Sequence, residues 1–175
     1  AGLYIITPDT LPYFALAPAS ANAFFGATNG QSATRDFCLA PDGTHNDVNV
    51  SLWPIGPARP GFNATYRLTY RNAGNQMLSG TVNFNYDDTR LDYVSASVLP
   101  TSQTTGNLNW AYANLLPFET RTVDIVLNVN SPMETPAVNN GDMLPFTASV
   151  NPVSGDETPT DNSVFFDQMV VGSYD

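Results

Sequence analysis

A two-residue alternation of apolar and polar side chains recurs along this chain and constrains its fold more than any other feature. In 62–70, apolar and aromatic residues alternate with Asn63, Thr65, Arg67 and Thr69. This period places the two sets on opposite faces of a strand, so a strand with one buried face is indicated. The same alternation occurs in three further segments, Asp47–Trp53, Thr81–Tyr86 and Val123–Val129.

Shorter apolar runs extend the pattern, and turn-forming residues separate them. These runs are 91–98, 108–113, 144–150 and 164–171, with clusters of Gly, Pro and Asn between them. No segment combines an apolar period of 3.6 residues with helix caps. The chain is therefore predicted to be all-β, as an antiparallel two-sheet sandwich of about seven to nine strands over residues 36–175.

Residues 1–35 have a different composition and are predicted to lie outside that sandwich. They contain a single acid, Asp9, and they are rich in Ala and aromatic residues. They suffice for two or three strands but not for a core of their own. We interpret them as the tail of a preceding module or as added edge strands, with a boundary near Arg35–Asp36, and we expect the chain to be part of a longer protein.

The charge balance excludes several classes of partner. Sixteen acids stand against six basic residues, all of them Arg, which gives a net charge of −10. Nucleic-acid binding requires clustered cations, and docking on an anionic membrane requires them too, so neither partner is expected. No apolar run reaches the length of a membrane span. Acidic loops, in contrast, are compatible with divalent cations.

The chain offers little for catalysis. The one histidine, His45, lies in a predicted solvated turn, and no Gly-x-Ser-x-Gly elbow accompanies it. With a single His and a single Cys, a structural zinc site is not expected either. Cys38 has no disulfide partner and sits between Phe37 and Leu39, so we expect it to be a small buried apolar residue. The sequence predicts a protein that is not an enzyme.

Two groups of acids could bind a metal ion. Asp156, Glu157, Asp161 and Asn162 share one loop, which Pro159 stiffens, and Asp87 and Asp88 form a second pair. Calcium prefers six to eight oxygen ligands, and such loops offer carboxylate, amide and carbonyl oxygens together. The alternative is that these acids are solvated and cap backbone N–H groups in turns. Calcium is the one cofactor that the sequence suggests.

The two tryptophans receive different predictions from their position in the alternation. Trp110 shares the parity of Leu108 and Tyr112 and is predicted to lie in the core. Trp53 has the parity of the polar residues in its strand, so it is either exposed or packed under the following proline-rich loop. An exposed ring could stack on a sugar, which makes Trp53 the candidate ligand-binding residue.

From about Asp36 onward, the chain resembles a repeat module of large secreted Bacteroidetes proteins, which precedes a type IX secretion sorting domain. The resemblance rests on a set of short segments: 36–41, 57–62, 70–72, 91–98, 115–120, 131–136, 155–162 and 172–175. Three overlapping segments, 70–74, 116–120 and 156–162, also resemble the immunoglobulin-like conserved repeat domain of bacterial surface proteins. The resemblance implies an immunoglobulin-like fold and secretion to the cell surface, and it implies no catalytic residues.

The segment Asp9-Thr10-Leu11 resembles the Asp-(Ser/Thr)-apolar O-glycosylation motif of Bacteroidetes, so Thr10 is a candidate modification site; a plain turn after Pro8 is the alternative. The function predicted from the sequence is that of a spacer or adhesion module whose partners are the neighbouring domains of the same polypeptide. The alternative is a module that binds surface glycans or proteins through Trp53.

Overall fold

The computed structural model describes residues 1–172, in which every regular element is a strand. The chain divides into two compact units, Ala1–His45 and Asn46–Asp175. In the described residues, no helix has the length and hydropathy that a membrane span needs.

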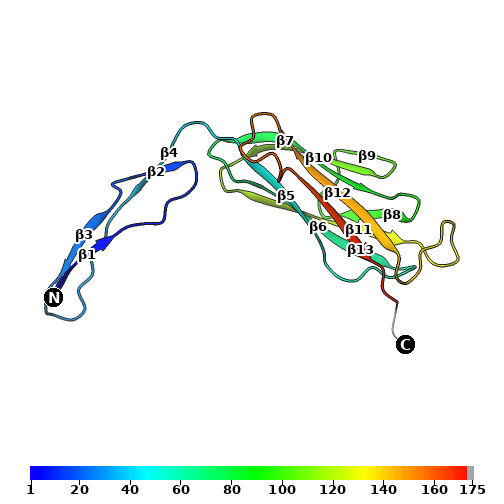
Figure 1. Ribbon diagram of the computed structural model, residues 1–175, viewed down its shortest axis with the longest axis horizontal. Coiled ribbons are helices and arrows are strands. Elements are labelled where there is room, and N and C mark those ends of the chain that lie inside the picture. Colours follow the sequence, from blue (N-terminus) through cyan, green and yellow to red (C-terminus); the bar gives the residue numbers. More distant parts are fainter. Residues whose placement is uncertain (173–175) are drawn as a thin grey trace. The chain divides into compact units, whose positions relative to one another are not determined.

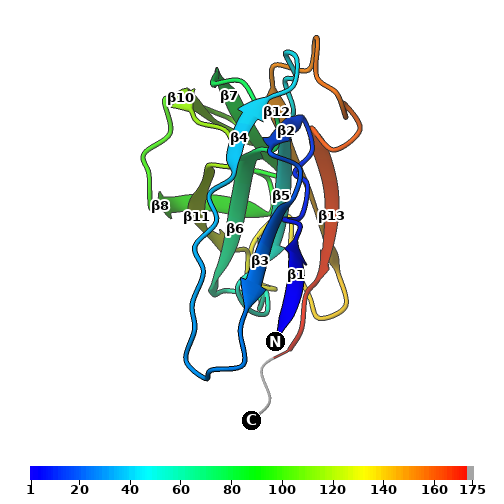
Figure 2. The ribbon, with the colours of Figure 1, turned by 90° about the vertical axis from the view of Figure 1, so that its left-hand side faces the viewer.

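The N-terminal unit is built from two small antiparallel sheets. Strand β1 (Gly2–Ile6) pairs with β3 (Ala21–Phe25), and β2 (Phe14–Ala17) pairs with β4 (Cys38–Pro41) (Figure 2). Because β4 pairs back onto β2, the division between the units falls after His45, ten residues beyond the expected Arg35.

A two-stranded sheet has no second layer to cover it, and the side chains of this unit show the consequence. Leu3, Ile5 and Phe24 are 63%, 70% and 68% exposed. Ala23 is the one apolar residue that is fully buried among the described residues of this unit. Cys38 is exposed as well, so the prediction that it is buried was wrong. Apolar neighbours in the sequence bury a residue only where another layer packs against the strand.

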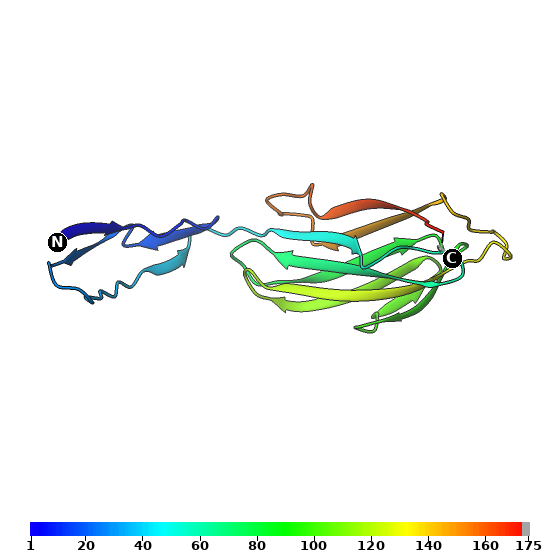
Figure 3. The same cartoon turned by 90° about the horizontal axis from the view of Figure 1, so that it is seen from below.

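The second unit is a sandwich of two antiparallel sheets (Figures 1 and 3). One sheet has the strand order β13-β12-β7-β10-β9, and the other has the order β5-β6-β11-β8. In the described residues this gives nine strands, which confirms the predicted fold class. Their bounds are β5 (Val48–Pro54), β6 (Asn63–Asn72), β7 (Leu78–Tyr86), β8 (Leu91–Ala96), β9 (Ser102–Thr104), β10 (Asn107–Leu115), β11 (Thr120–Val129), β12 (Met143–Asn151) and β13 (Ser163–Met169).

The inward-facing side chains of the two sheets meet in one apolar core, as the alternation predicts. Tyr66 from β6 contacts Phe146 from β12 with ring centroids 4.4 Å apart, and Phe84 from β7 stacks on Phe146 at 5.7 Å. All three rings are essentially buried. Burial in this core raises the pKa of the Tyr66 hydroxyl. Trp110 is 3% exposed and donates from Nε1 to the Val98 carbonyl, which confirms its predicted place in the core.

The outer edge of β5 is closed by the loop between β12 and β13. The amide of Val50 donates to the Asp161 carbonyl at 3.1 Å, and the amide of Glu157 donates to the Asn46 carbonyl at 2.8 Å. The amide of Val48 donates to Asp156 Oδ2 at 2.9 Å. These bonds join the first strand of the four-stranded sheet to a loop of the five-stranded sheet, and we call this line of contact the seam.

Substituting Phe84→Ala should lower the free energy of unfolding by about 3–5 kcal/mol, because it removes a fully buried ring and leaves a cavity in the core. Denaturant unfolding measures this change. The matched control is Phe165→Ala, whose ring is 65% exposed; it should change the free energy of unfolding by less than about 0.5 kcal/mol. Equal effects of the two substitutions would contradict the assigned inward faces.

Cys38 should react with a thiol reagent in the native protein, because its strand has no covering layer. The measurement compares the labelling rate in buffer with the rate in denaturant, and similar rates are expected. Labelling that requires unfolding would contradict the exposed position.

Candidate metal centre

Three aspartates converge at the seam. Asp47 immediately precedes β5, and Asp156 and Asp161 lie in the loop between β12 and β13. One carboxylate oxygen from each lies within 4.8 Å of those of the other two. Asp47 is 6% exposed, so this group is not a solvated surface cluster.

Local backbone structure fixes the loop acids in place. Asn46 and Asp156 form an isolated parallel β-bridge, which places residue 156 beside the start of β5. Asp156 Oδ1 accepts a hydrogen bond from the Thr158 amide at 2.9 Å, so the carboxylate also organises its own turn. A further turn bond, from the Asp161 amide to the Thr158 carbonyl at 3.0 Å, brings Asp161 back toward the seam.

The electrostatics of this group disfavour three bare carboxylates. Burial raises the pKa of Asp161, and the negative charges of Asp47 and Asp156 raise it further. Asp161 Oδ1 is buried and accepts no hydrogen bond from any residue that the structure describes. The same holds for Asn162 Oδ1, on a residue that is 2% exposed and whose Nδ2 donates to Asp156 Oδ2 at 3.2 Å.

These donors suit a hard divalent cation. All the candidate ligand atoms are oxygens, and calcium takes carboxylate and amide oxygens in flexible geometry, whereas zinc sites are usually built from nitrogen and sulfur. A bound cation would offset the repulsion among the three carboxylates and would satisfy buried oxygens that accept no hydrogen bond. The residues present therefore fit a calcium ion.

The structure brings together three of the four loop residues that the sequence singled out. Asp156, Asp161 and Asn162 lie at the seam, whereas Glu157 is exposed and its carboxylate is not part of the acidic group. Asp47 was missed as a ligand, because it reaches the loop only through the tertiary fold. A single aspartate directly before an alternating strand was the one signal in the sequence.

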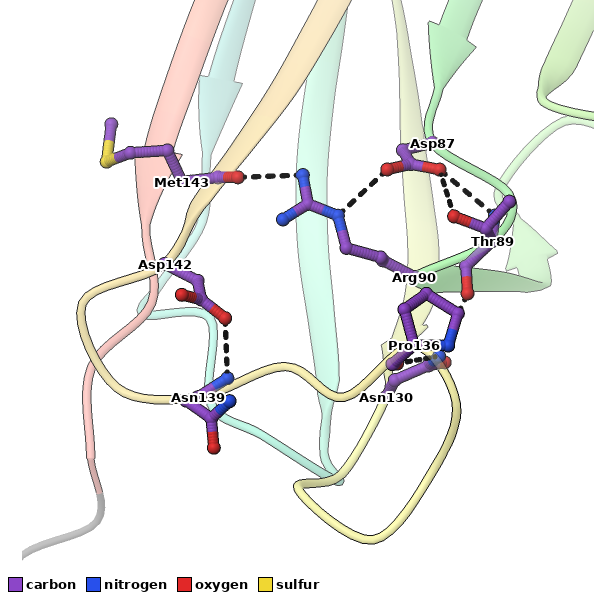
Figure 4. Close-up of polar contacts among 8 residues, drawn as sticks. All are labelled: Asp87, Thr89, Arg90, Asn130, Pro136, Asn139, Asp142 and Met143. Carbon is purple, nitrogen blue, oxygen red and sulfur yellow. Dashed lines mark hydrogen bonds and ion pairs between the residues drawn. The ribbon is translucent and has the colours of Figure 1, made fainter.

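The second predicted acidic pair is arranged differently. Asp87 Oδ2 accepts from Arg90 Nε at 2.8 Å, and its Oδ1 accepts from the hydroxyl of Thr89 at 2.6 Å (Figure 4). Asp88 Oδ1 accepts from the Tyr86 hydroxyl at 3.1 Å. Asp87 therefore organises the β7–β8 turn with Arg90, whose Nη2 also donates to the Met143 carbonyl. These contacts give Asp87 the role of a turn-capping acid.

The remaining candidate residues are not members of the acidic group. Trp53 is 64% exposed, as one of its two predicted alternatives required. Thr10 is exposed in the segment between β1 and β2. His45 is half-buried and stacks on Tyr13 with ring centroids 4.5 Å apart, instead of standing free in solvent.

A cavity of about 350 Å³ lies beside the loop that connects β8 to β9. Its lining includes Tyr70, Leu99, Trp110 and Arg121, and none of its lining residues is an acid or a histidine. The guanidinium of Arg121 donates to Glu119 Oε1 at 2.7 Å and to two backbone carbonyls. This hollow therefore lacks the pair of acids or the nucleophile–base pair that hydrolytic chemistry requires.

Comparisons with known proteins support the fold. No family model and no curated protein matches the chain. Among solved structures, the CARDB domain of the PF1109 protein from Pyrococcus furiosus, solved in complex with di-metal ions, is similar at a TM-score of 0.52 and 17% identity, over 75% of this chain and 98% of that one. At this identity the likeness concerns the fold alone.

Two further structures are similar at lower scores. A cohesin module of a family 33 glycoside hydrolase from Clostridium perfringens has a TM-score of 0.49 and 12% identity, over 75% of this chain and 100% of that one. A β-glucosidase from Listeria innocua has a TM-score of 0.38 and 14% identity, over 77% of this chain and 18% of that one. The two antiparallel sheets of the second unit, with the strand orders given above, form an immunoglobulin-like β sandwich.

In the presence of a chelator, Asp161→Asn should raise the free energy of unfolding at neutral pH, because it removes a buried charge that Asp47 and Asp156 repel. The raised pKa of Asp161 means that the folded state binds its proton more tightly than the unfolded state does. The stability of the wild type should therefore increase as pH falls from that raised pKa toward 3.8, its ordinary value, and the variant should lack this increase. Thermal unfolding across this pH range measures both effects.

The matched control for this experiment is Asp167→Asn, which changes an exposed aspartate on β13. Its unfolding should follow the wild-type pH profile. A variant at Asp161 that is less stable than the wild type at neutral pH in chelator would contradict the repulsion.

Proposed function

We propose that this protein is a non-catalytic structural or adhesion module of a larger secreted bacterial cell-surface protein, in which a calcium ion holds the two sheets together at the seam. The observation that carries the proposal is the convergence of Asp47, at the start of β5, with Asp156 and Asp161 of the loop between β12 and β13. The proposed ligands are their carboxylates together with the amide oxygen of Asn162.

The position of the seam suits a spacer that carries mechanical load. The sandwich begins at Asn46, and β5 follows directly, so a pull on the N-terminal side acts first on this strand. Among residues 1–172, β5 pairs with one strand, β6, and its other edge is held by the loop bonds at Val48 and Val50. A cation that bridges Asp47 to Asp156 and Asp161 would reinforce this edge where backbone pairing is weakest.

The setting of the module rests on its sequence. The resemblance to repeat modules of Bacteroidetes proteins supports a cell-surface location that is reached by type IX secretion. The partners are then the neighbouring domains of the same polypeptide. The acidic composition supplies carboxylates that can bind calcium. Extracellular calcium-binding modules bind the ion at about 10⁻⁴–10⁻³ M.

A second function is favoured by one observation. Trp53 projects an aromatic ring that is 64% exposed from the outer face of the four-stranded sheet. Binding of a surface glycan or of another protein is therefore the alternative to a purely structural role.

Calcium should raise the melting temperature of metal-free protein. At a concentration about 100 times the dissociation constant, binding adds roughly 2.7 kcal/mol to the free energy of unfolding. For a domain of this size, that corresponds to a rise of about 6–12 °C. A melting scan in chelator and in about 10–100 mM calcium measures the difference, because this concentration is about 100 times a dissociation constant of 10⁻⁴–10⁻³ M.

Two variants separate this site from general charge effects. Asp47→Asn should abolish most of the calcium-induced rise, whereas Glu157→Gln should retain it, because Glu157 lies in the loop of Asp156 and Asp161 but outside the acidic group. An unchanged midpoint of the wild type in about 10–100 mM calcium would refute the calcium clamp, and so would equal losses in the two variants.

A further inference from the structure

The outer face of the four-stranded sheet carries a row of three side chains that crosses three strands. In the antiparallel register, Trp53 on β5 lies opposite Arg67 on β6, and Arg67 lies opposite Asp124 on β11. Adjacent strands are about 4.8 Å apart, so the row extends over roughly 10 Å. We call Trp53, Arg67 and Asp124, with the flanking Thr65 and Thr69 of β6, the Trp53 face.

The polar half of this face is held in place. Arg67 donates from Nε to Asp124 Oδ1 and from Nη2 to Asp124 Oδ2, both at 2.8 Å. The two side chains remain accessible, at 51% and 33% exposure. The positive charge of Arg67 and the negative charge of Asp124 cancel, so the pair has no net charge. Hydrogen bonding to Arg67 lowers the pKa of Asp124, which keeps the carboxyl group ionised.

We infer that the Trp53 face binds a neutral polysaccharide. The apolar face of a pyranose ring stacks on an exposed indole, which removes the apolar surface of Trp53 from water. An adjoining sugar would lie over the Arg67–Asp124 pair. There, guanidinium N–H groups donate to hydroxyl oxygens, and carboxylate lone pairs accept from hydroxyl protons.

The composition of the face favours a sugar over a protein. The core of a protein interface is enriched in aromatic residues and Arg, and several such side chains are buried there together among apolar neighbours. On the Trp53 face, one ring adjoins an ion pair and two threonines, a mixture of stacking and hydrogen-bonding groups that suits a hydroxyl-rich ligand. The balanced charge suits a neutral chain, in a protein whose net charge is −10.

This site is separate from the proposed calcium centre. Trp53 lies near the C-terminal end of β5, whereas Asp47 precedes the first residue of that strand. Sugar binding should therefore persist in the Asp47→Asn variant, so failure of the calcium clamp would leave this inference standing.

The test is affinity electrophoresis of the whole chain in native gels that contain laminarin, xylan, mannan or dextran. At least one of these polysaccharides should retard the wild type, and Trp53→Ala should weaken that binding by about tenfold or more, in line with the loss of a stacked ring. Arg67→Gln should weaken it to a smaller extent. Trp110 is buried, so a change in tryptophan fluorescence on binding would report on Trp53.

The matched control is Phe165→Ala, which removes an aromatic ring of similar exposure, 65%, from the other sheet, and which should bind like the wild type. Melting scans would show that each variant is folded. The inference is overturned if none of the four polysaccharides retards the wild type. It is also overturned if Trp53→Ala and Phe165→Ala bind equally, or if Trp53 supports self-association of the protein in place of sugar binding.

Discussion

The closure of the seam is the interaction on which the rest of the sandwich depends. β5 pairs with β6 on one side, and its other edge would be open without the loop between β12 and β13. That loop supplies acceptors to Val48 and Val50 and thereby joins the edges of two sheets whose inner faces share one core. An open strand edge invites pairing with other chains, so this closure also protects the module from aggregation.

The same closure concentrates negative charge where water has little access. Backbone bonds bring the loop close to the start of β5, and three carboxylates arrive there together. Their repulsion, and the buried oxygens of Asp161 and Asn162 that accept no hydrogen bond, oppose the closure that the backbone bonds favour. The proposed calcium ion would reverse the sign of this electrostatic contribution, and the stability of the fold would then depend on a ligand.

The two proposed activities use different parts of one strand. The start of β5 belongs to the seam, which is buried and acidic, whereas its outer face near the other end carries Trp53 beside a neutral ion pair. A sandwich permits this separation because alternate residues of a strand face the core and the solvent. The proposed calcium ion would stiffen β5 at its start. Trp53, near the other end of β5, and the Arg67–Asp124 pair lie on the same sheet, so a stiffer sheet would hold these three side chains in a fixed arrangement.

The sequence by itself determined eight of the nine strands described in the sandwich and their faces, because the period of two is a local property of the chain. The exception is β9 (Ser102–Thr104), which lies in the segment 100–106 that its Pro and Gly residues assigned to a turn. The alternation placed Trp110 in the core and allowed Trp53 to be exposed, and both are so in the structure. The sequence also selected Asp156, Asp161 and Asn162 as candidate ligands. Only the tertiary structure decided which layers cover which strands, and this is why Cys38, in an apolar run, is exposed. Only the tertiary structure could also add Asp47, because Val48 and Asp156 are 108 residues apart and meet through the packing of two sheets.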